Sequence, residues 1–356
     1  MKRHYFLGGN TTEGFYSYYE SLLDQKAANK IYAIKGGPGT GKSTLMKKAA
    51  RWADSKNLEI DYLHCSSDPD SLDGVIIRDL RVALVDGTSP HIVDPQNPGC
   101  VDTILHMGEF WNETAIRDQK DNILACNAEI KAHYTRAYHY IRAAGEFYQD
   151  IAQINQACLS ETSVLEAAGQ LTSGVKKIPG RTGIKRKLFL TAISPLGVIS
   201  FPNSFTYPKT YILRGRITGG SSRVLAKAAR WFIENGYDIE CFYDPLRPRD
   251  HILHMTVPQI GVFITTDDFF TQYPTGAAGT AVDIDGLLNK NRASALAADL
   301  QESRELVGTM VDRAVTVIKK AKAVHDQLEQ YYVPYMDFER INLYQEQVLR
   351  DIERFL

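Results

Sequence analysis

The stretch IYAIKGGPGTGKST, from Ile31 to Thr44, decides the predicted fold of the first half of the chain. Its apolar beginning, Ile31–Lys35, predicts a strand, and the amphipathic segment Lys42–Ser55 predicts a helix. The loop between them matches the pattern GxxxxGK[ST], which in a strand-loop-helix context is typical of a phosphate-binding P-loop. The stretch therefore predicts an α/β domain of the P-loop NTPase type.

Each residue type in this loop has a physical reason to bind a nucleoside triphosphate. Glycines let backbone N–H groups turn toward an anion, and the helix N-terminus adds a partial positive charge. Lys42 supplies a cation for the terminal phosphates, and Ser43 can place its hydroxyl on Mg²⁺. We therefore expect ATP and Mg²⁺ as ligands, bound by Gly36, Gly37, Pro38, Gly39, Thr40, Gly41, Lys42, Ser43 and Thr44.

A second element supports this prediction. The apolar run Val82–Val85 ends in Asp86, which is the form of a Walker B strand. The Asp86 carboxylate would hold Mg²⁺ through water, opposite Ser43. Lys42 and Asp86 are therefore candidate catalytic residues.

Asp68, Asp70 and Asp73 follow a strand predicted at Leu58–Leu63, at the sheet edge where α/β folds bind ligands. One of them could accept a proton from a substrate hydroxyl or position an attacking water, with Asp68 and Asp70 as the catalytic candidates. The alternative is that Asp70 or Ser71 caps a short helix and that Asp73-Gly74 makes a turn.

Three residues nearby, His64, Cys65 and His91, raise the question of a metal site. They lack the short spacings of zinc motifs, so the sequence does not favour metal binding. We expect His91 to line the phosphate end of the site instead.

The chain contains a long internal repeat. Residues 48–52, KAARW, return as residues 227–231, and residues 2–7 and 31–36 have counterparts at 185–190 and 210–215. A repeat of this length indicates two similarly folded domains. We expect a first domain at residues 1–175, a basic linker at 176–187 and a second domain at 188–356.

Apolar residues also recur at every seventh position late in each half, as at Ile123, Ile130 and Ala137. This spacing predicts long antiparallel helical hairpins or coiled coils. The predicted fold is α/β, with tandem P-loop NTPase-type domains of three layers related by a pseudo-twofold. Each domain is expected to end in a long helical hairpin, at about residues 112–171 and 291–356.

The second copy of the loop, Gly215–Ser222, keeps the framing glycines but has Ser221 in place of the lysine. Thr265 or Thr266 falls where the strand-end aspartate is expected. Without the cation and the metal carboxylate, the second half is interpreted as a degenerate pseudo-domain. The alternatives are a site for a smaller anion, or donation of an arginine to the first site, with three candidate side chains: Arg214, Arg216 and Arg223.

Composition narrows the classes of function. The formal net charge is −1, so nucleic acid is not an expected partner. The first residues lack the pattern of a signal peptide, and no apolar run is long enough to span a membrane. The five cysteines contain no CxxC pair, which fits a reducing cytoplasm.

The P-loop, the segment 65–74 (CSSDPDSLDG) and the segment 86–91 (DGTSPH) together resemble a family of uncharacterised bacterial tandem P-loop proteins. Its members are described as ATP-binding or nucleotide-kinase-like, and the resemblance covers nearly the whole chain. It implies ATP binding but no substrate. Members often carry a P-loop in the second domain as well, which this chain lacks.

Three functional hypotheses follow. The first is an ATPase that uses hydrolysis to move its helices, and the second is a kinase acting on a small molecule or nucleotide. The third is a nucleotide-sensing interaction module in which ATP only sets the conformation. A protein partner or a small-molecule substrate is compatible with these hypotheses.

Overall fold

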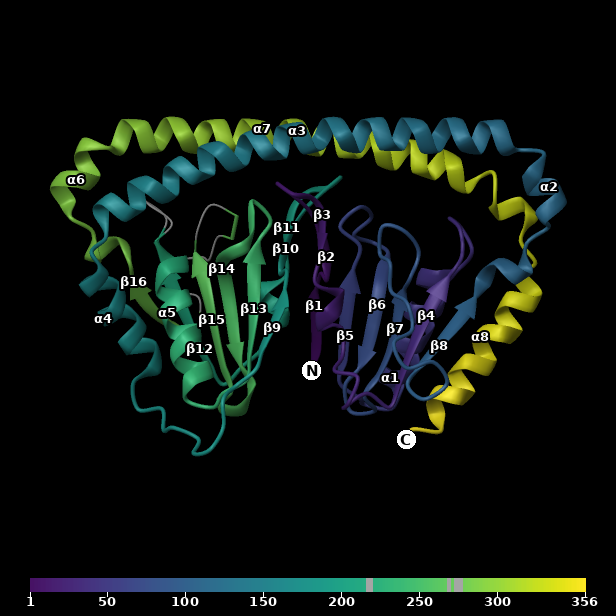
Figure 1. The fold of residues 1–356 in the computed structure, drawn as a ribbon, viewed down its shortest axis with the longest axis horizontal. Helices are drawn as coiled ribbons and strands as arrows, with labels where there is room; N and C mark the ends of the chain where they lie inside the picture. Colours follow the sequence, from purple (N-terminus) through teal and green to yellow (C-terminus); the bar gives the residue numbers. More distant parts are fainter. Residues whose placement is uncertain (216–219, 268–269, 272–277) are drawn as a thin grey trace.

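The computed structural model describes residues 1–215, 220–267, 270–271 and 278–356. The chain forms an α/β structure with two six-stranded mixed sheets, which stand side by side beneath a pair of long helices (Figure 1). Two short β-hairpins lie between the sheets, namely β2 (Gly8–Thr11) with β3 (Gly14–Ser17) and β10 (Thr191–Ser194) with β11 (Gly197–Ser200).

The first sheet has the strand order β1-β5-β6-β7-β4-β8. Strand β6 runs antiparallel to β5 and β7, whereas the other neighbouring strands are parallel. Its elements are β1 (Lys2–Tyr5), β4 (Lys30–Lys35), α1 (Lys42–Ser55), β5 (Ile60–His64), β6 (Leu72–Ile77), β7 (Val82–Asp86) and β8 (Asp102–His106).

Strand β6 is an element that the sequence analysis missed in this domain, as it also missed β8. All six of its residues are buried, so they do not show the alternation by which a half-buried strand is recognised. Because β6 begins at Leu72, Asp73 is a strand residue and does not begin a turn.

The second sheet repeats the same topology, with the order β9-β13-β14-β15-β12-β16. The antiparallel strand is again the one between the second and fourth positions, here β14. The elements are β9 (Lys185–Leu188), β12 (Lys209–Arg214), α5 (Ser221–Glu234), β13 (Ile239–Asp244), β14 (Arg247–Val257), β15 (Val262–Asp267) and β16 (Thr280–Asp283). The matching order agrees with the repeat seen in the sequence.

The two long helices, α3 (Lys120–Cys158) and α7 (Ala297–Glu329), pack on each other and run in opposite directions across both sheets (Figure 1). The prediction of one long hairpin inside each half is therefore wrong, because the partner of each long helix comes from the other half. The apolar spacing identified the contact face, which includes Ala137 and Ala314. It does not specify which helix covers that face.

The last helix of each half also packs on the domain of the other half. Helix α4 (Glu161–Thr172) lies against α5, and α8 (Phe338–Glu353) lies against α1. Two short helices, α2 (Glu113–Arg117) and α6 (Lys290–Ala295), lead into α3 and α7. The halves of the sequence thus exchange their terminal helices, and neither packed domain is a continuous stretch of chain.

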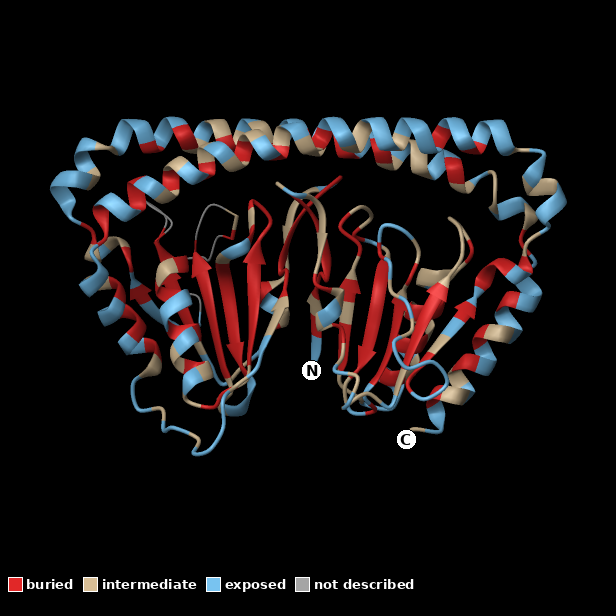
Figure 2. Ribbon diagram, viewed as in Figure 1, coloured by how far each residue is buried: buried red, intermediate tan, exposed pale blue. Residues whose placement is uncertain are grey.

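The layering also differs from the three layers predicted. In the first domain, α1 and α8 share one apolar cluster with one face of the sheet. The other face joins a cluster common to both domains, where Leu63 and Val85 gather with Phe242 and Phe263. Figure 2 shows the sheets as the most deeply buried parts of the molecule. In the described chain, helices therefore cover one face of each sheet, and the shared cluster covers the other.

A buried charge cluster with pseudo-twofold symmetry lies where the domains meet. Arg3 of β1 pairs with Asp61 of β5 at 2.5 Å and with Glu240 of β13 at 2.7 Å. Arg186 of β9, the counterpart of Arg3, pairs with Glu240 at 2.8 Å. Burial alone would raise the pKa of Glu240, but Arg3 and Arg186 together lower it to about 2.

Two backbone hydrogen bonds complete this junction. Phe6 N donates to Phe189 O at 2.8 Å, and Phe189 N donates to Phe6 O at 3.0 Å. Arg186, which belongs to the predicted basic linker, is therefore part of the interface and not a solvated connector.

Among the described residues, no helix has both the length and the apolar character needed to cross a bilayer.

Candidate functional site

The predicted phosphate-binding segment, which we call the glycine loop (Gly36–Ser43), connects the end of β4 to the start of α1. Gly39 and Gly41 have φ of 69° and 83°, in the left-handed region that side-chain-bearing residues rarely adopt. A Cβ on Gly36 would lie 2.8 Å from Thr40 Oγ1. The loop closes tightly on itself, and these glycines are needed for that shape.

The loop presents donors that could bind an anion. In the described chain, the N–H groups of Gly39, Gly41 and Lys42 donate to no backbone carbonyl. Lys42 Nζ lies over the loop and donates to Gly36 O at 2.9 Å and to Gly37 O at 2.8 Å. Free N–H groups at a helix N-terminus beside an ammonium form an anion-binding arrangement.

Ser43 is the last residue of this loop, and Asp86 lies beside it. Ser43 Oγ accepts a hydrogen bond from Leu72 N at 3.0 Å, and Asp86 Oδ1 accepts one from Thr88 N at 2.8 Å. The other carboxylate oxygen, Asp86 Oδ2, is 3.7 Å from Lys42 Nζ. Strand β7 pairs directly with β4, and this pairing brings the Asp86 carboxylate to the loop.

The end of the chain covers the glycine loop. A Cβ on Gly39 would meet Val333 Cγ2 at 2.6 Å, and one on Gly37 would meet the ring of Tyr332 at 3.3 Å. Gln345 of α8 donates through Nε2 to Gly41 O at 3.3 Å. The sequence contained no signal for these contacts, because residues 332–345 are some three hundred positions away along the chain.

The three aspartates considered as bases lie in different environments. Asp68 accepts a hydrogen bond from Ser71 Oγ at 2.9 Å and is 3.6 Å from Lys322 Nζ of α7. Asp70 is exposed, whereas Asp73 is buried in β6. Burial raises the pKa of Asp73, His91 lowers it, and the charge of nearby Asp86 raises it further.

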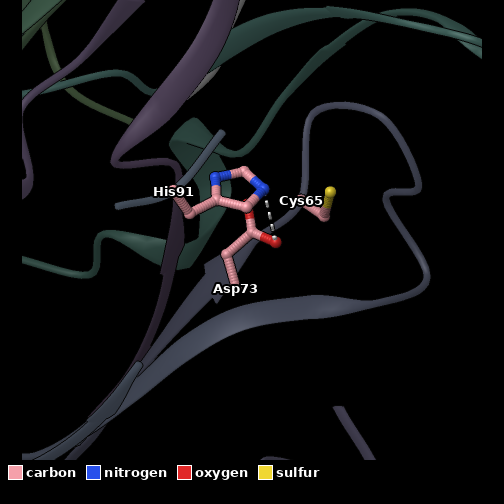
Figure 3. Close-up of side chains that lie close together, drawn as sticks. All are labelled: Cys65, Asp73 and His91. Atoms are coloured by element: carbon pink, nitrogen blue, oxygen red, sulfur yellow. Dashed lines mark ion pairs between the residues drawn. The ribbon is translucent and has the colours of Figure 1, made fainter. Parts of the chain in front are cut away.

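Asp73 belongs to a buried cluster with Cys65 and His91 (Figure 3). One potential ligand atom from each side chain lies within 4.8 Å of the other two, and His91 Nε2 is 3.6 Å from Asp73 Oδ1. Burial raises the pKa of the Cys65 thiol, and the charge of Asp73 raises it further. The sequence analysis grouped His64 with Cys65 and His91, but His64 lies beside His4 at 2.8 Å instead.

Asp73 was not grouped with Cys65 and His91 because β6 was not recognised. Cys65 follows β5, His91 follows β7, and β6 lies between those strands. A prediction of three adjacent strands would have placed all three side chains at one sheet edge. The fully buried β6 offered no periodic signal to support it.

One contact of this region recurs in the described part of the second domain. Ser222 Oγ accepts from Ile252 N at 3.1 Å, as Ser43 does from Leu72. Arg214 pairs with Asp267 at 2.9 Å, and Arg223 donates to Leu159 O at 2.8 Å. Neither arginine therefore points to the first domain's loop, and Arg216 lies outside the described residues.

Asp267 is a strand-end carboxylate that the sequence analysis overlooked. In the sheet register, Asp86 is opposite Ile34, and the equivalent pair in the second domain is Thr266 with Leu213. Thr266, one of the two positions proposed, is thus the counterpart of Asp86. Asp267 follows it and is ion-paired within its own domain.

No protein-family model, curated protein or solved structure matches this chain.

Proposed function

We propose that the first domain binds a nucleoside triphosphate with Mg²⁺ at the glycine loop. The observation that carries this proposal is the combination of a left-handed Gly39 and Gly41, free N–H groups and the ammonium of Lys42 at one helix N-terminus. The resemblance to bacterial tandem P-loop proteins supports the same ligand, with ATP as the expected nucleotide.

The side chains around the loop fit this role. Lys42 would exchange its two loop carbonyls for phosphate oxygens, which are stronger acceptors because they are charged. Ser43 and Asp86 offer the hydroxyl and carboxylate oxygens that Mg²⁺ prefers. When bound, the metal would neutralise charge on the phosphates.

We further propose that nucleotide hydrolysis changes the position of the long helices. Support comes from the segment after α7, where Val333 and Tyr332 touch the glycine loop. A second contact joins α7 to the same sheet edge, through Lys322 and Asp68. A ligand that reshapes the loop or its edge would thus act on α7, which extends over the second domain.

The same contacts favour a second candidate, a nucleotide sensor without turnover. In that case nucleotide binding alone would shift the equilibrium between two positions of α7. The size of the shift would depend on how much more tightly the nucleotide binds one of these conformations than the other.

Phosphate release by the full chain, measured with ATP and Mg²⁺, tests these proposals. We expect steady release without any acceptor. Stoichiometric binding without release would favour the sensor, and ADP formation only with an added small-molecule acceptor would instead indicate a kinase. If calorimetry detects no binding of any nucleoside triphosphate, the proposal is wrong.

A further inference from the structure

The cluster of Cys65, Asp73 and His91 brings together three side chains of different chemistry from three separate segments. Cys65 follows β5, Asp73 lies in β6, and His91 lies in the connection between β7 and β8. All three are buried, and Figure 3 shows the Asp73 carboxylate facing a ring nitrogen of His91, with Cys65 beside the pair. A thiol, an imidazole and a carboxyl are the ligand types found in zinc sites.

The spacing suits a single tetrahedral ion. Two nitrogen or oxygen ligands at 2.0–2.1 Å from zinc lie about 3.3 Å apart, and a sulfur ligand at 2.3 Å lies about 3.6 Å from either. His91 Nε2 and Asp73 Oδ1 are 3.6 Å apart, and all three ligand atoms lie within 4.8 Å of one another. Side-chain movements of up to about an ångström would bring the three atoms to these ideal separations.

The hydrogen bonds of the cluster are incomplete, although Cys65 and His91 both stabilise the Asp73 carboxylate. In the described chain, Asp73 Oδ2 is buried and accepts no hydrogen bond. Leaving a buried carboxylate oxygen without a partner is costly, and a cation would remove that cost. A thiolate and a carboxylate together balance the charge of one divalent ion.

Neighbouring side chains hold the histidine in a ligand orientation. His91 Nδ1 is 2.8 Å from Tyr19 OH, which leaves Nε2 directed at Asp73. The ring of Phe15 packs edge-on against the imidazole at 5.0 Å. Metal-binding histidines usually have such a hydrogen bond on the second ring nitrogen.

The donor set selects the metal. Sulfur and imidazole ligands suit Zn²⁺, whereas Mg²⁺ and Ca²⁺ prefer oxygen. Among the described residues of the second domain there is no equivalent, since the sheet register places Leu253 at the position of Asp73. The cluster therefore accompanies the domain with the complete glycine loop.

We propose that Cys65, Asp73 and His91 bind one Zn²⁺ ion, at a site distinct from the Mg²⁺ site expected at Ser43 and Asp86. Three protein ligands leave a fourth tetrahedral position for water, as in catalytic rather than structural zinc sites.

Cobalt titration of the full chain tests this proposal. The protein carries Cys100→Ser, which removes an exposed thiol elsewhere, and is first stripped of metal with a chelator. We expect one equivalent of Co²⁺ to bind, with a thiolate-to-cobalt charge-transfer band and the visible absorption of a tetrahedral site. Zn²⁺ should displace the cobalt. Failure of the folded protein to develop this band would overturn the proposal.

Variants assign the ligands. Cys65→Ala should abolish the charge-transfer band, whereas Cys126→Ala, at another buried cysteine, should retain it. Tyr19→Phe should weaken cobalt binding about ten- to a hundredfold, because the histidine loses its orienting partner. An unchanged band in Cys65→Ala would refute the assignment.

Two further measurements keep the result unambiguous. If the Cys65 variant fails to fold, X-ray absorption of the zinc-loaded parent should show one sulfur ligand at about 2.3 Å with lighter ligands at about 2.0–2.2 Å. A spectrum without sulfur would overturn the proposal. Lys42→Ala should keep the cobalt band, so loss of nucleotide binding and loss of zinc binding are distinguished.

Discussion

Single residues of the glycine loop have separable roles in the proposed nucleotide site. Lys42 is the only part of the loop that carries a full positive charge, and its two hydrogen bonds are to loop carbonyls. The backbone shape depends instead on Gly39 and Gly41. Removal of the lysine side chain should therefore affect ligand affinity far more than folding.

The first prediction concerns Lys42→Ala. Loss of a charge-assisted contact is worth about 1.5–3 kcal/mol, so ATP affinity should fall roughly ten- to a hundredfold. Calorimetry measures the affinity, and Lys47→Ala on the same helix serves as the control. Equal affinities for Lys42→Ala and the parent protein would contradict the role assigned to this lysine.

At the scale of elements, the exchange of terminal helices decides which parts of the chain stabilise each other. Helix α8 comes from the end of the chain, yet Ile341, Val348 and Ile352 are buried against α1 and the first sheet. The first domain therefore depends on residues that follow the second domain in sequence.

The second prediction tests that dependence through Ile352→Ala. Ile352 is fully buried, and such truncations cost about 2–5 kcal/mol. Hydrogen exchange should show lost protection in α1 and the first sheet, with the second sheet less affected. Leu343→Ala, on the same helix but 65% exposed, is the matched control. Loss of protection confined to the second sheet would contradict the observed packing.

At the scale of the whole molecule, the domains are joined by the charge cluster of Arg3, Asp61, Arg186 and Glu240. Glu240 is its shared acceptor, contacted by an arginine from each half of the sequence. Removal of its charge would leave the buried Arg3 and the partly buried Arg186 without their common partner.

The third prediction is that Glu240→Gln destabilises the chain by about 3–5 kcal/mol, as expected for breaking a buried ion pair. Denaturant unfolding measures the change. Glu234→Gln removes an exposed ion pair with Arg230 and should cost at most about 1 kcal/mol. Similar costs for the two variants would show that the cluster does not hold the domains together.

The fourth prediction concerns the dependence of stability on pH. Burial lowers the pKa of His4 and His251 to about 4 and that of His254 to about 3, and burial also lowers the pKa of His64. Between those values and the ordinary 6.5, the unfolded chain binds more protons than the folded chain. The free energy of unfolding should therefore fall as pH decreases from about 6.5 to 4.

The raised pKa of Asp73 contributes with the opposite sign, but the four histidines outnumber it. Denaturant unfolding at a series of pH values measures the slope. Replacement of the fully buried His254 by asparagine should make the decline shallower. Stability that rose steadily toward pH 4 would be inconsistent with neutral buried histidines.

The sequence by itself was sufficient to predict features that depend on residues close to one another in the chain. The pattern from Ile31 to Ser55 predicted β4, the glycine loop and α1 correctly, because strand, loop and helix signals adjoin one another. The repeat predicted two similar sheet domains, and the seven-residue spacing identified the buried faces of α3 and α7. The place of Asp86 beside the loop followed from its position at the end of an apolar strand.

Only the tertiary structure decided which surfaces meet. An apolar stripe specifies that a helix must be covered, and it carries no information about which chain segment covers it. For that reason α3 pairs with α7, α8 packs on α1, and residues near Val333 lie on the glycine loop, none of which was predicted. The same holds for Cys65, Asp73 and His91, because a strand buried on both faces has no sequence periodicity to reveal the neighbour that brings them together.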